Sequence, residues 1–239
     1  MPQYLDVDRL EAIETEAFRS ASPYPWANPE GLLTQEGYRT LLDNMPDVSM
    51  FERKFGKQRR GEQAPHDRYS LEYTEGMAVP GPWQDFIGEL RSDLYRNTIA
   101  RLFDANDPEF RFHWHYTPAG RSVSPHCDSK REFGSHIWYF NREGEWDPSW
   151  GGDTLVLDDG GRFAPDSAPA FEDFDEIITC RSEGNRSAIL ERSERGWHGV
   201  RAITCPEGYM RKVFIVVVNP SSLYWRVRDR LMGKEIQRL

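Results

Sequence analysis

The 239-residue sequence has no apolar run that approaches the roughly 18 residues of a membrane-spanning helix. Its first residues, Met1 to Asp6, lack a basic segment followed by an apolar core, so we expect no signal peptide. Cysteine is also scarce, because Cys127, Cys180 and Cys205 are the whole set and none forms a CxxC pair. This sparse, odd number argues against a disulfide framework and predicts a cytoplasmic protein without membrane contact.

Positive charge is in deficit. The 30 Lys and Arg are outnumbered by 39 Asp and Glu, which gives a formal net charge of −9. A surface built to bind nucleic acid is normally basic, so we expect no nucleic-acid partner. Aromatic residues are plentiful, with eight Trp, ten Tyr and thirteen Phe, and they favour a packed core with a cleft. The chain is long enough to bury such a core in one domain.

The first part of the chain, residues 1–105, has the pattern of helices and loops. Its clearest helix is predicted to begin at Pro82 and to continue to Phe103, with apolar residues along one face. The polar segment 52–68 has two interpretations. It is either a solvated loop or an arm that supplies Arg59, Arg60 or Arg68 to a substrate, and the first is the simpler.

Strand patterns dominate after residue 106. The segment 110–116 alternates strictly, so that Phe112, Trp114 and Tyr116 face one way and the residues between them the other. Residues 213–219 are almost all apolar, which is typical of a strand buried on both sides. About eight short strands separated by turn signals indicate a sandwich or jelly roll.

The predicted fold is therefore mainly β with flanking helices, a double-stranded β-helix or jelly roll. We expect a single domain over residues 1–239, in which a helical N-terminal region (1–105) packs on the sheet of a core at 106–220. A C-terminal helix is expected at 221–239, where Leu223, Val227 and Leu231 share one face.

The short stretch from Ser124 to Ser129 contains the pattern His126-Cys127-Asp128. On an extended strand alternate side chains share a face, so His126 and Asp128 would point the same way. An imidazole and a carboxylate are two thirds of the 2-His-1-carboxylate triad that suits non-haem Fe(II). The third candidate is His198, in Gly196-Trp197-His198-Gly199-Val200.

Other histidines compete for the third position. His113 and His115 form an HxH pair on one strand face, and His136 precedes another strand, but none has a nearby carboxylate on the same face. Arg211 follows His198 by thirteen residues and opens the apolar strand. A buried arginine needs an anionic partner, and its fork geometry suits a carboxylate. Considered without the other residues, Arg211 is more simply interpreted as a strand-edge charge in water.

Together these residues resemble the Fe(II)- and 2-oxoglutarate-dependent dioxygenases, and within them the prolyl-hydroxylase-like group, over residues 110–219. Further matches are Tyr116, ten residues ahead of His126, Tyr139 in a Trp-Tyr-Phe-Asn strand end, and a Gly151-Gly152 pair before the next strand. The interval from His198 to Arg211 is a few residues longer than in many members of this family. It leaves open whether Arg211 or Lys212 reaches the co-substrate.

The resemblance implies an oxidoreductase in which His126, Asp128 and His198 are the catalytic metal ligands. It further implies that Arg211 and Tyr139 bind the distal carboxylate of 2-oxoglutarate and that Tyr116 lines its pocket. The implied reaction hydroxylates a substrate with O₂, releases succinate and CO₂, and has ascorbate as a candidate reductant.

The residues indicate neither the substrate nor the oligomeric state. A small molecule is favoured, and a protein-residue hydroxylase is the alternative within enzymes. A nucleic-acid demethylase of the AlkB type is disfavoured by the acidic charge. A jelly-roll protein that binds metal or ligand without oxidation is the alternative outside enzymes. Candidate substrate contacts are Arg131, Trp146 and the segment 52–73.

Overall fold

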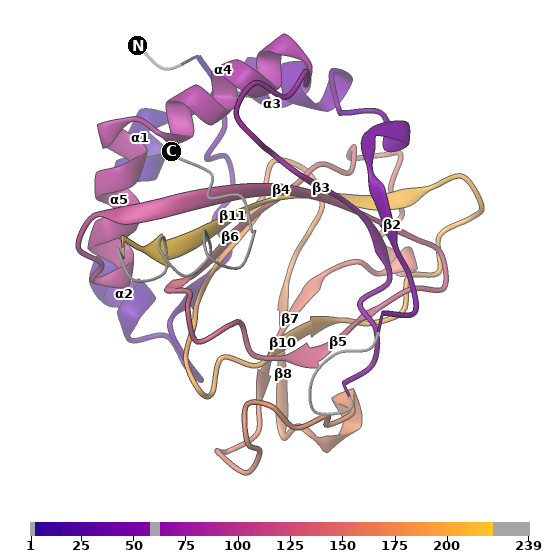
Figure 1. Ribbon diagram of the computed structural model, residues 1–239. Helices are drawn as coiled ribbons and strands as arrows, with labels where there is room; N and C mark the ends of the chain where they lie inside the picture. Colours follow the sequence, from indigo (N-terminus) through magenta and orange to yellow (C-terminus); the bar gives the residue numbers. More distant parts are fainter. Residues whose placement is uncertain (1–2, 58–62, 222–239) are drawn as a thin grey trace, which may run out of the picture.

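The computed structural model describes residues 3–57 and 63–221. Two antiparallel sheets face each other, and the helices lie on the outer side of the larger sheet (Figure 1). This arrangement confirms the predicted jelly roll with flanking helices. Arg59, Arg60 and residues 222–239 of the predicted C-terminal helix lie outside the described residues.

The larger sheet has seven strands in the order β1-β9-β6-β11-β4-β3-β2. Their bounds are β1 Trp26–Ala27, β2 Glu52–Lys54, β3 Arg68–Glu72, β4 Pro108–Pro118, β6 Gly134–Tyr139, β9 Ser187–Glu191 and β11 Met210–Pro220. Three of these strands (β1, β2 and β3) precede residue 106. The region that the sequence pattern assigned mainly to helices therefore also extends the sheet at both of its edges.

The smaller sheet has the order β5-β10-β7-β8. Its strands are β5 Val123–His126, β7 Thr154–Asp158, β8 Glu176–Cys180 and β10 His198–Val200. The short strand β10 lies between β5 and β7, and its first residue, His198, pairs with His126 on one side and Val156 on the other. His198 is thus part of a strand in the middle of the smaller sheet.

Strands β4 and β11 pair along their whole length, with Thr117 opposite Arg211 and His115 opposite Val213. On β4, Phe112 and Trp114 are buried beneath the helices, and the residues between them face the second sheet. Both faces of β11 are covered, because Phe214, Val216 and Val218 pack in the core beneath the helices while Val213 and Ile215 face the smaller sheet, and this explains its nearly continuous apolar sequence.

Five α-helices are present in the described residues. They are α1 Val7–Glu11, α2 Thr15–Arg19, α3 Gln35–Asp43, α4 Gly81–Leu90 and α5 Asp93–Phe103. The single helix predicted from Pro82 to Phe103 is thus two helices, because Ser92 has extended backbone angles and serves as the N-cap of α5. The rings of Trp83 and Phe86 on α4 pack on Phe214 of β11 at centroid distances of 5.0 and 5.8 Å. None of the described helices combines the length and apolar character needed to cross a bilayer.

Candidate metal centre and its cavity

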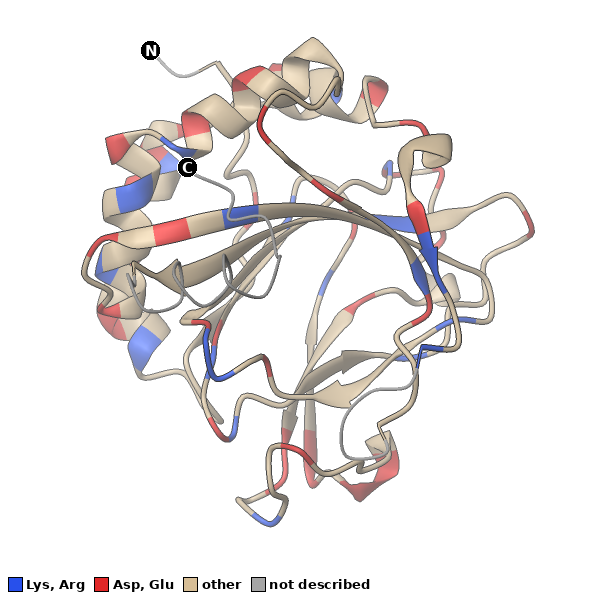
Figure 2. Cartoon of the chain, viewed as in Figure 1, with Lys and Arg blue, Asp and Glu red and all other residues tan. Residues whose placement is uncertain are grey.

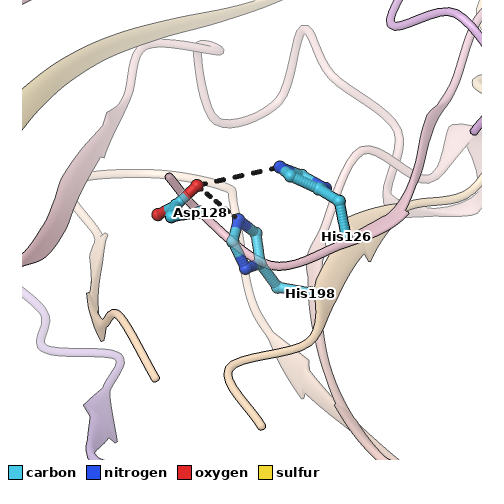
Figure 3. Close-up of side chains that lie close together, drawn as sticks. All are labelled: His126, Asp128 and His198. Carbon is cyan, nitrogen blue, oxygen red and sulfur yellow. Dashed lines mark ion pairs between the residues drawn. The ribbon is translucent and has the colours of Figure 1, made fainter. Parts of the chain in front are cut away.

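His126, Asp128 and His198 converge on one point between the two sheets (Figure 3). One potential ligand atom from each lies within 4.8 Å of the others. The Oδ1 atom of Asp128 is 3.8 Å from Nε2 of His126 and 3.6 Å from Nε2 of His198. The two histidines are direct cross-strand partners on β5 and β10. Asp128 lies just beyond the end of β5 rather than within it, and its carboxylate still turns toward both imidazoles.

Both imidazoles are held with Nε2 directed at the carboxylate. Nδ1 of His126 is 2.9 Å from the carbonyl oxygen of Ser124, and Nδ1 of His198 is 3.0 Å from that of Gly196. A carbonyl can only accept, so each Nδ1 carries a proton, which leaves Nε2 as the nitrogen that can bind a metal. Two imidazoles and one carboxylate, all largely buried, therefore fit a divalent metal that prefers mixed nitrogen and oxygen ligands, such as Fe(II).

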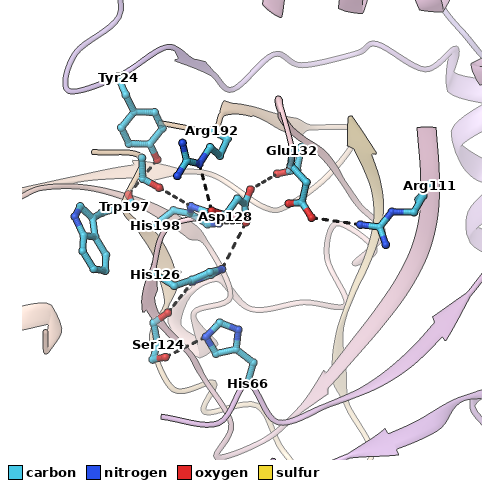
Figure 4. A network of polar contacts seen from close by, with 12 residues as sticks. Tyr24, His66, Arg111, Ser124, His126, Asp128, Glu132, Arg192, Trp197 and His198 are labelled. Atoms are coloured by element: carbon cyan, nitrogen blue, oxygen red, sulfur yellow. Dashed lines mark hydrogen bonds and ion pairs between the residues drawn. The ribbon is translucent and has the colours of Figure 1, made fainter. Parts of the chain in front are cut away.

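The surroundings of the three residues fix their positions further (Figure 4). The hydroxyl of Ser135 donates to Oδ2 of Asp128 at 3.3 Å, which leaves Oδ1 directed at the histidines. His66 lies beside His126 with ring centroids 4.4 Å apart, and its Nε2 is 3.0 Å from the hydroxyl of Ser124. Neither Ser135 nor His66 was predicted, because a serine within a strand and a lone histidine in a polar loop carry no recognisable spacing.

A cavity of about 360 Å³ adjoins the three residues and extends across the inner face of the larger sheet. Its charged and histidine lining comprises Lys54, His66, Arg68, Arg111, His113, His115, His126, Asp128, Glu132, His198 and Arg211. The other candidates for the third metal ligand lie apart from the triad. His113 and His115 line this cavity, whereas His136 lies in the core with its Nδ1 2.9 Å from the hydroxyl of Tyr95.

Arg211 is a buried cation at this cavity, only 4% exposed. Its Nε donates to the carbonyl oxygen of Gly152, and its Nη2 donates to the hydroxyl of Thr154 at 3.1 Å. Burial lowers the pKa of Arg211, and no carboxylate of the described residues forms an ion pair with it. Lys212 faces the opposite side of the sheet, with its ammonium 5.6 Å from the ring centroid of Tyr116. Of the two residues, Arg211 is therefore the one that reaches the cavity.

Tyr139 lies behind Arg211 rather than at the cavity surface. Its hydroxyl donates to that of Thr154 at 2.8 Å, and the Arg211 guanidinium carbon is 5.5 Å from its ring centroid. Burial raises the pKa of Tyr139, so its hydroxyl stays protonated and remains a donor. Tyr139 and Thr154 together hold the guanidinium in place.

The prediction that Tyr116 lines the cavity is wrong. Its ring packs on Phe51 at 4.2 Å on the helix side of the sheet, and its hydroxyl donates to the carbonyl oxygen of Pro46 at 2.8 Å. Strand alternation is the reason, because Thr117 is the cross-strand partner of Arg211 and shares its face. Trp146 also lies elsewhere, packed with Ile203 and Cys205.

Two facing antiparallel sheets with a His-Asp-His cluster between them form a jelly roll, and solved structures of 2-oxoglutarate- and Fe(II)-dependent oxygenases have a similar fold. Similar solved structures include a Pseudomonas putida prolyl-4-hydroxylase, with a TM-score of 0.61, 16% sequence identity and coverage of 88% of this chain and 98% of that one. A Trichoplax adhaerens prolyl hydroxylase, solved with a peptide fragment of hypoxia inducible factor, has a TM-score of 0.62 at 10% identity, covering 96% of this chain and 94% of that one.

A third similar structure is SnoK, a non-haem α-ketoglutarate-dependent carbocyclase from nogalamycin biosynthesis. It has a TM-score of 0.57 at 11% identity, covering 96% of this chain and 93% of that one. No protein-family model and no curated protein sequence matches the chain. At these low sequence identities the structural similarities establish only the fold. As a similarity of fold, the predicted resemblance to the prolyl-hydroxylase-like group is confirmed.

Proposed function

We propose that the protein is an Fe(II)- and 2-oxoglutarate-dependent oxygenase that hydroxylates a small-molecule substrate. One observation carries the proposal: His126, Asp128 and His198 converge beside a cavity that also holds a buried arginine, Arg211, which forms no ion pair with any carboxylate in the described part of the chain. A triad alone would suit many metal proteins. A nearby buried cation in addition suits a co-substrate that has a second carboxylate.

In this proposal the Nε2 atoms of His126 and His198 and a carboxylate oxygen of Asp128 would hold an Fe(II) ion. The bound iron, with 2-oxoglutarate and O₂, would supply an oxidation that yields succinate, CO₂ and a hydroxylated substrate. Arg211 binds the distal carboxylate of 2-oxoglutarate, with Thr154 as a neighbouring hydroxyl. Tyr139 positions both of them. The burial of these groups excludes water and strengthens each charge–charge contact.

A small molecule is the proposed substrate class because the cavity volume of about 360 Å³ is at the lower end of the range for small-molecule sites. A protein-residue hydroxylase is the second candidate. It is favoured by the structural similarity to an enzyme whose solved structure contains a peptide fragment.

The proposal is tested by succinate formation from 2-oxoglutarate in the presence of Fe(II) and ascorbate. We expect turnover by the unaltered protein, and we expect Asp128→Ala to abolish it because the metal loses its only carboxylate ligand. Asp166→Ala removes an exposed carboxylate far along the chain and should retain full turnover. Binding of Fe(II) and 2-oxoglutarate without succinate, across a broad substrate panel, would instead support a non-catalytic binding protein. Sustained turnover in Asp128→Ala would exclude Asp128 as a ligand.

A further inference from the structure

We propose that His115 and Ser70, with His113 beside them, form a hydrogen-bonding face of the cavity, and that this face receives an uncharged polar group of the substrate, an amide or a hydroxyl. The inference rests on the proposed function and narrows its substrate class. It also gives a role to the HxH pair of β4, which is not part of the candidate metal centre.

The three side chains share the inner face of β3 and β4. Ser70 is the direct cross-strand partner of His115. His113 and His115 are alternate residues of β4, so they point the same way, and their ring centroids are 6.0 Å apart. All three residues line the cavity that adjoins the candidate metal centre. A small molecule in this cavity can therefore contact the face and the metal centre together.

The polar atoms of this face are not used by the protein itself. In the part of the chain that the structure describes, neither the hydroxyl of Ser70 nor a ring nitrogen of His115 forms a hydrogen bond. Nε2 of His113 is 3.9 Å from Oε1 of Glu72, which is beyond hydrogen-bonding distance. Shielded polar groups in folded proteins almost always have a partner. Water can serve them in the free protein, and a ligand that makes the same hydrogen bonds can replace it.

The face carries no charge of its own. Burial lowers the pKa of His113 to about 3, with Arg111, Lys54 and Arg68 acting in the same direction. Burial also lowers the pKa of His115 well below its usual value. Each imidazole is therefore neutral at physiological pH and offers one donor and one acceptor. An amide or a hydroxyl also combines a donor with an acceptor, whereas a carboxylate only accepts.

Two basic residues that also line the cavity have acidic partners. Arg111 contacts Glu132 at 3.3 Å and Glu72 at 4.0 Å, and Lys54 contacts Glu52 at 3.2 Å. Over the rest of the molecule, acidic and basic residues are both scattered across the helices and outer loops (Figure 2). An uncharged substrate group at the face would leave these ion pairs intact.

The neighbouring strand β11 adds an apolar surface beside the polar one. Val213 lies opposite His115 and Ile215 lies opposite His113, and both apolar side chains line the cavity. The substrate is therefore expected to combine an amide or a hydroxyl with an apolar part. A wholly apolar molecule would leave the polar groups of β3 and β4 without partners, and a site built for hydrogen bonding discriminates against such a ligand.

The experiment measures the binding of matched probes to the full chain supplied with Zn(II) and 2-oxoglutarate. Zn(II) accepts nitrogen and oxygen ligands but has no redox chemistry, so the probes are not consumed. The probes are benzamide beside acetophenone and benzyl alcohol beside toluene, and the second member of each pair lacks hydrogen-bonding groups of the first. Ligand-observed NMR titrations give the dissociation constants. We expect the second member to bind about 3- to 10-fold more weakly, the loss expected for one net hydrogen bond.

Four variants assign the preference to the face. His115→Leu should bring the two dissociation constants of each pair to within about twofold of each other, and Ser70→Ala should reduce the difference. His115→Gln keeps a donor and an acceptor and should retain the preference. Tyr69→Phe is the matched control, because it removes a hydroxyl from the same strand as Ser70 on the helix side, where the Tyr69 ring lies 5.3 Å from that of Phe55.

The outcomes separate this inference from the proposed function. Equal binding within both pairs, no binding by any probe, or a preference that persists in His115→Leu and Ser70→Ala would overturn the face and leave the oxygenase proposal standing. A raised KM for 2-oxoglutarate in His115→Leu with an unaltered probe preference would also overturn it, because His115 would then serve the co-substrate. An intact preference in a protein that forms no succinate would contradict the oxygenase and the assignment to a substrate, and the face would remain a ligand site.

Discussion

Arg211 and Lys212 are adjacent in sequence but point to opposite faces of β11. Arg211 lines the cavity, whereas Lys212 lies over the ring of Tyr116 on the helix side. We therefore predict that Arg211→Met raises the apparent KM for 2-oxoglutarate at least ~10-fold, the loss expected for a charge-assisted hydrogen bond to a carboxylate. Steady-state succinate formation at varied 2-oxoglutarate measures it.

Lys212→Met is the matched control for this prediction, because it removes a neighbouring charge on the other face. Its KM for 2-oxoglutarate should stay within about twofold of the unaltered value, since its side chain does not reach the cavity. The KM for Fe(II) should change little in either variant. Equal rises in KM for both substitutions would mean that the arginine has no direct role.

The sequence could predict the residues that converge at the site because several weak patterns occur in the order of a known family: His126 and Asp128 in an HxD pattern, then His198, then Arg211. It could not predict the details that fix them. The hydrogen bonds from Nδ1 of His126 and His198 go to backbone carbonyls, and the contact from Ser135 crosses between the two sheets. Such contacts depend on where separate strands meet, and the spacing of residues along the sequence does not reveal this.

At the scale of one element, β4 shows what strand alternation predicts well and what it leaves open. The alternation correctly divided residues 110–116 into two faces, and Phe112, Trp114 and Tyr116 do share one of them. It could not say which face meets the metal site, since both faces of this strand are covered. The spacing between Tyr116 and His126 then selected the wrong face. The pairing with β11 identifies the face of β4 that lines the cavity, because it places Thr117 opposite Arg211.

The placement of Tyr116 leads to a prediction about stability rather than binding. Tyr116→Phe leaves the buried carbonyl of Pro46 without its donor, so the free energy of unfolding should fall by about 1–2 kcal/mol. The KM for 2-oxoglutarate should not change, because the ring faces the helices. Denaturant unfolding and succinate kinetics measure the two effects.

Tyr139→Phe makes the same chemical change on the opposite face and is the comparison for Tyr116→Phe. Its hydroxyl holds Thr154 beside Arg211, so its loss should raise the KM for 2-oxoglutarate. If Tyr116→Phe instead raises the KM for 2-oxoglutarate and leaves the free energy of unfolding unchanged, the Tyr116 side chain must face the cavity. The pair thus tests the direction of both side chains on their strands.

For the whole molecule, the sequence predicted two facing sheets because short strands and turns alternate after residue 106. It missed the contribution of β1 and β2, which are two and three residues long and lie in a proline-rich and a polar segment. Short edge strands of this kind form because a longer strand is available to pair with, and local sequence carries little of that information. The division into an N-terminal region, a core and a C-terminal helix stays a prediction.

The buried histidines predict how the whole molecule responds to acid. Burial lowers the pKa of His136 to about 3, where its ring is stacked on Trp138 at 4.1 Å. In the unfolded chain the same histidine titrates near pH ~6.5, so below that pH the unfolded state binds one more proton than the folded state. Its contribution to stability is therefore complete above pH ~6.5 and is lost as the pH falls toward 3, by about 1.4 kcal/mol per pH unit.

His136→Asn removes the titrating group and retains an amide that can hydrogen-bond Tyr95. Between pH 7 and pH 5 we expect its free energy of unfolding to fall by about 2 kcal/mol less than that of the unaltered protein. Tyr95→Phe disturbs the same contact but keeps the imidazole, so it should retain the unaltered pH dependence. Denaturant unfolding at both pH values gives the comparison. Identical pH dependence in His136→Asn and the unaltered protein would mean that His136 is not held neutral by the core, and that acid destabilises the fold through other groups.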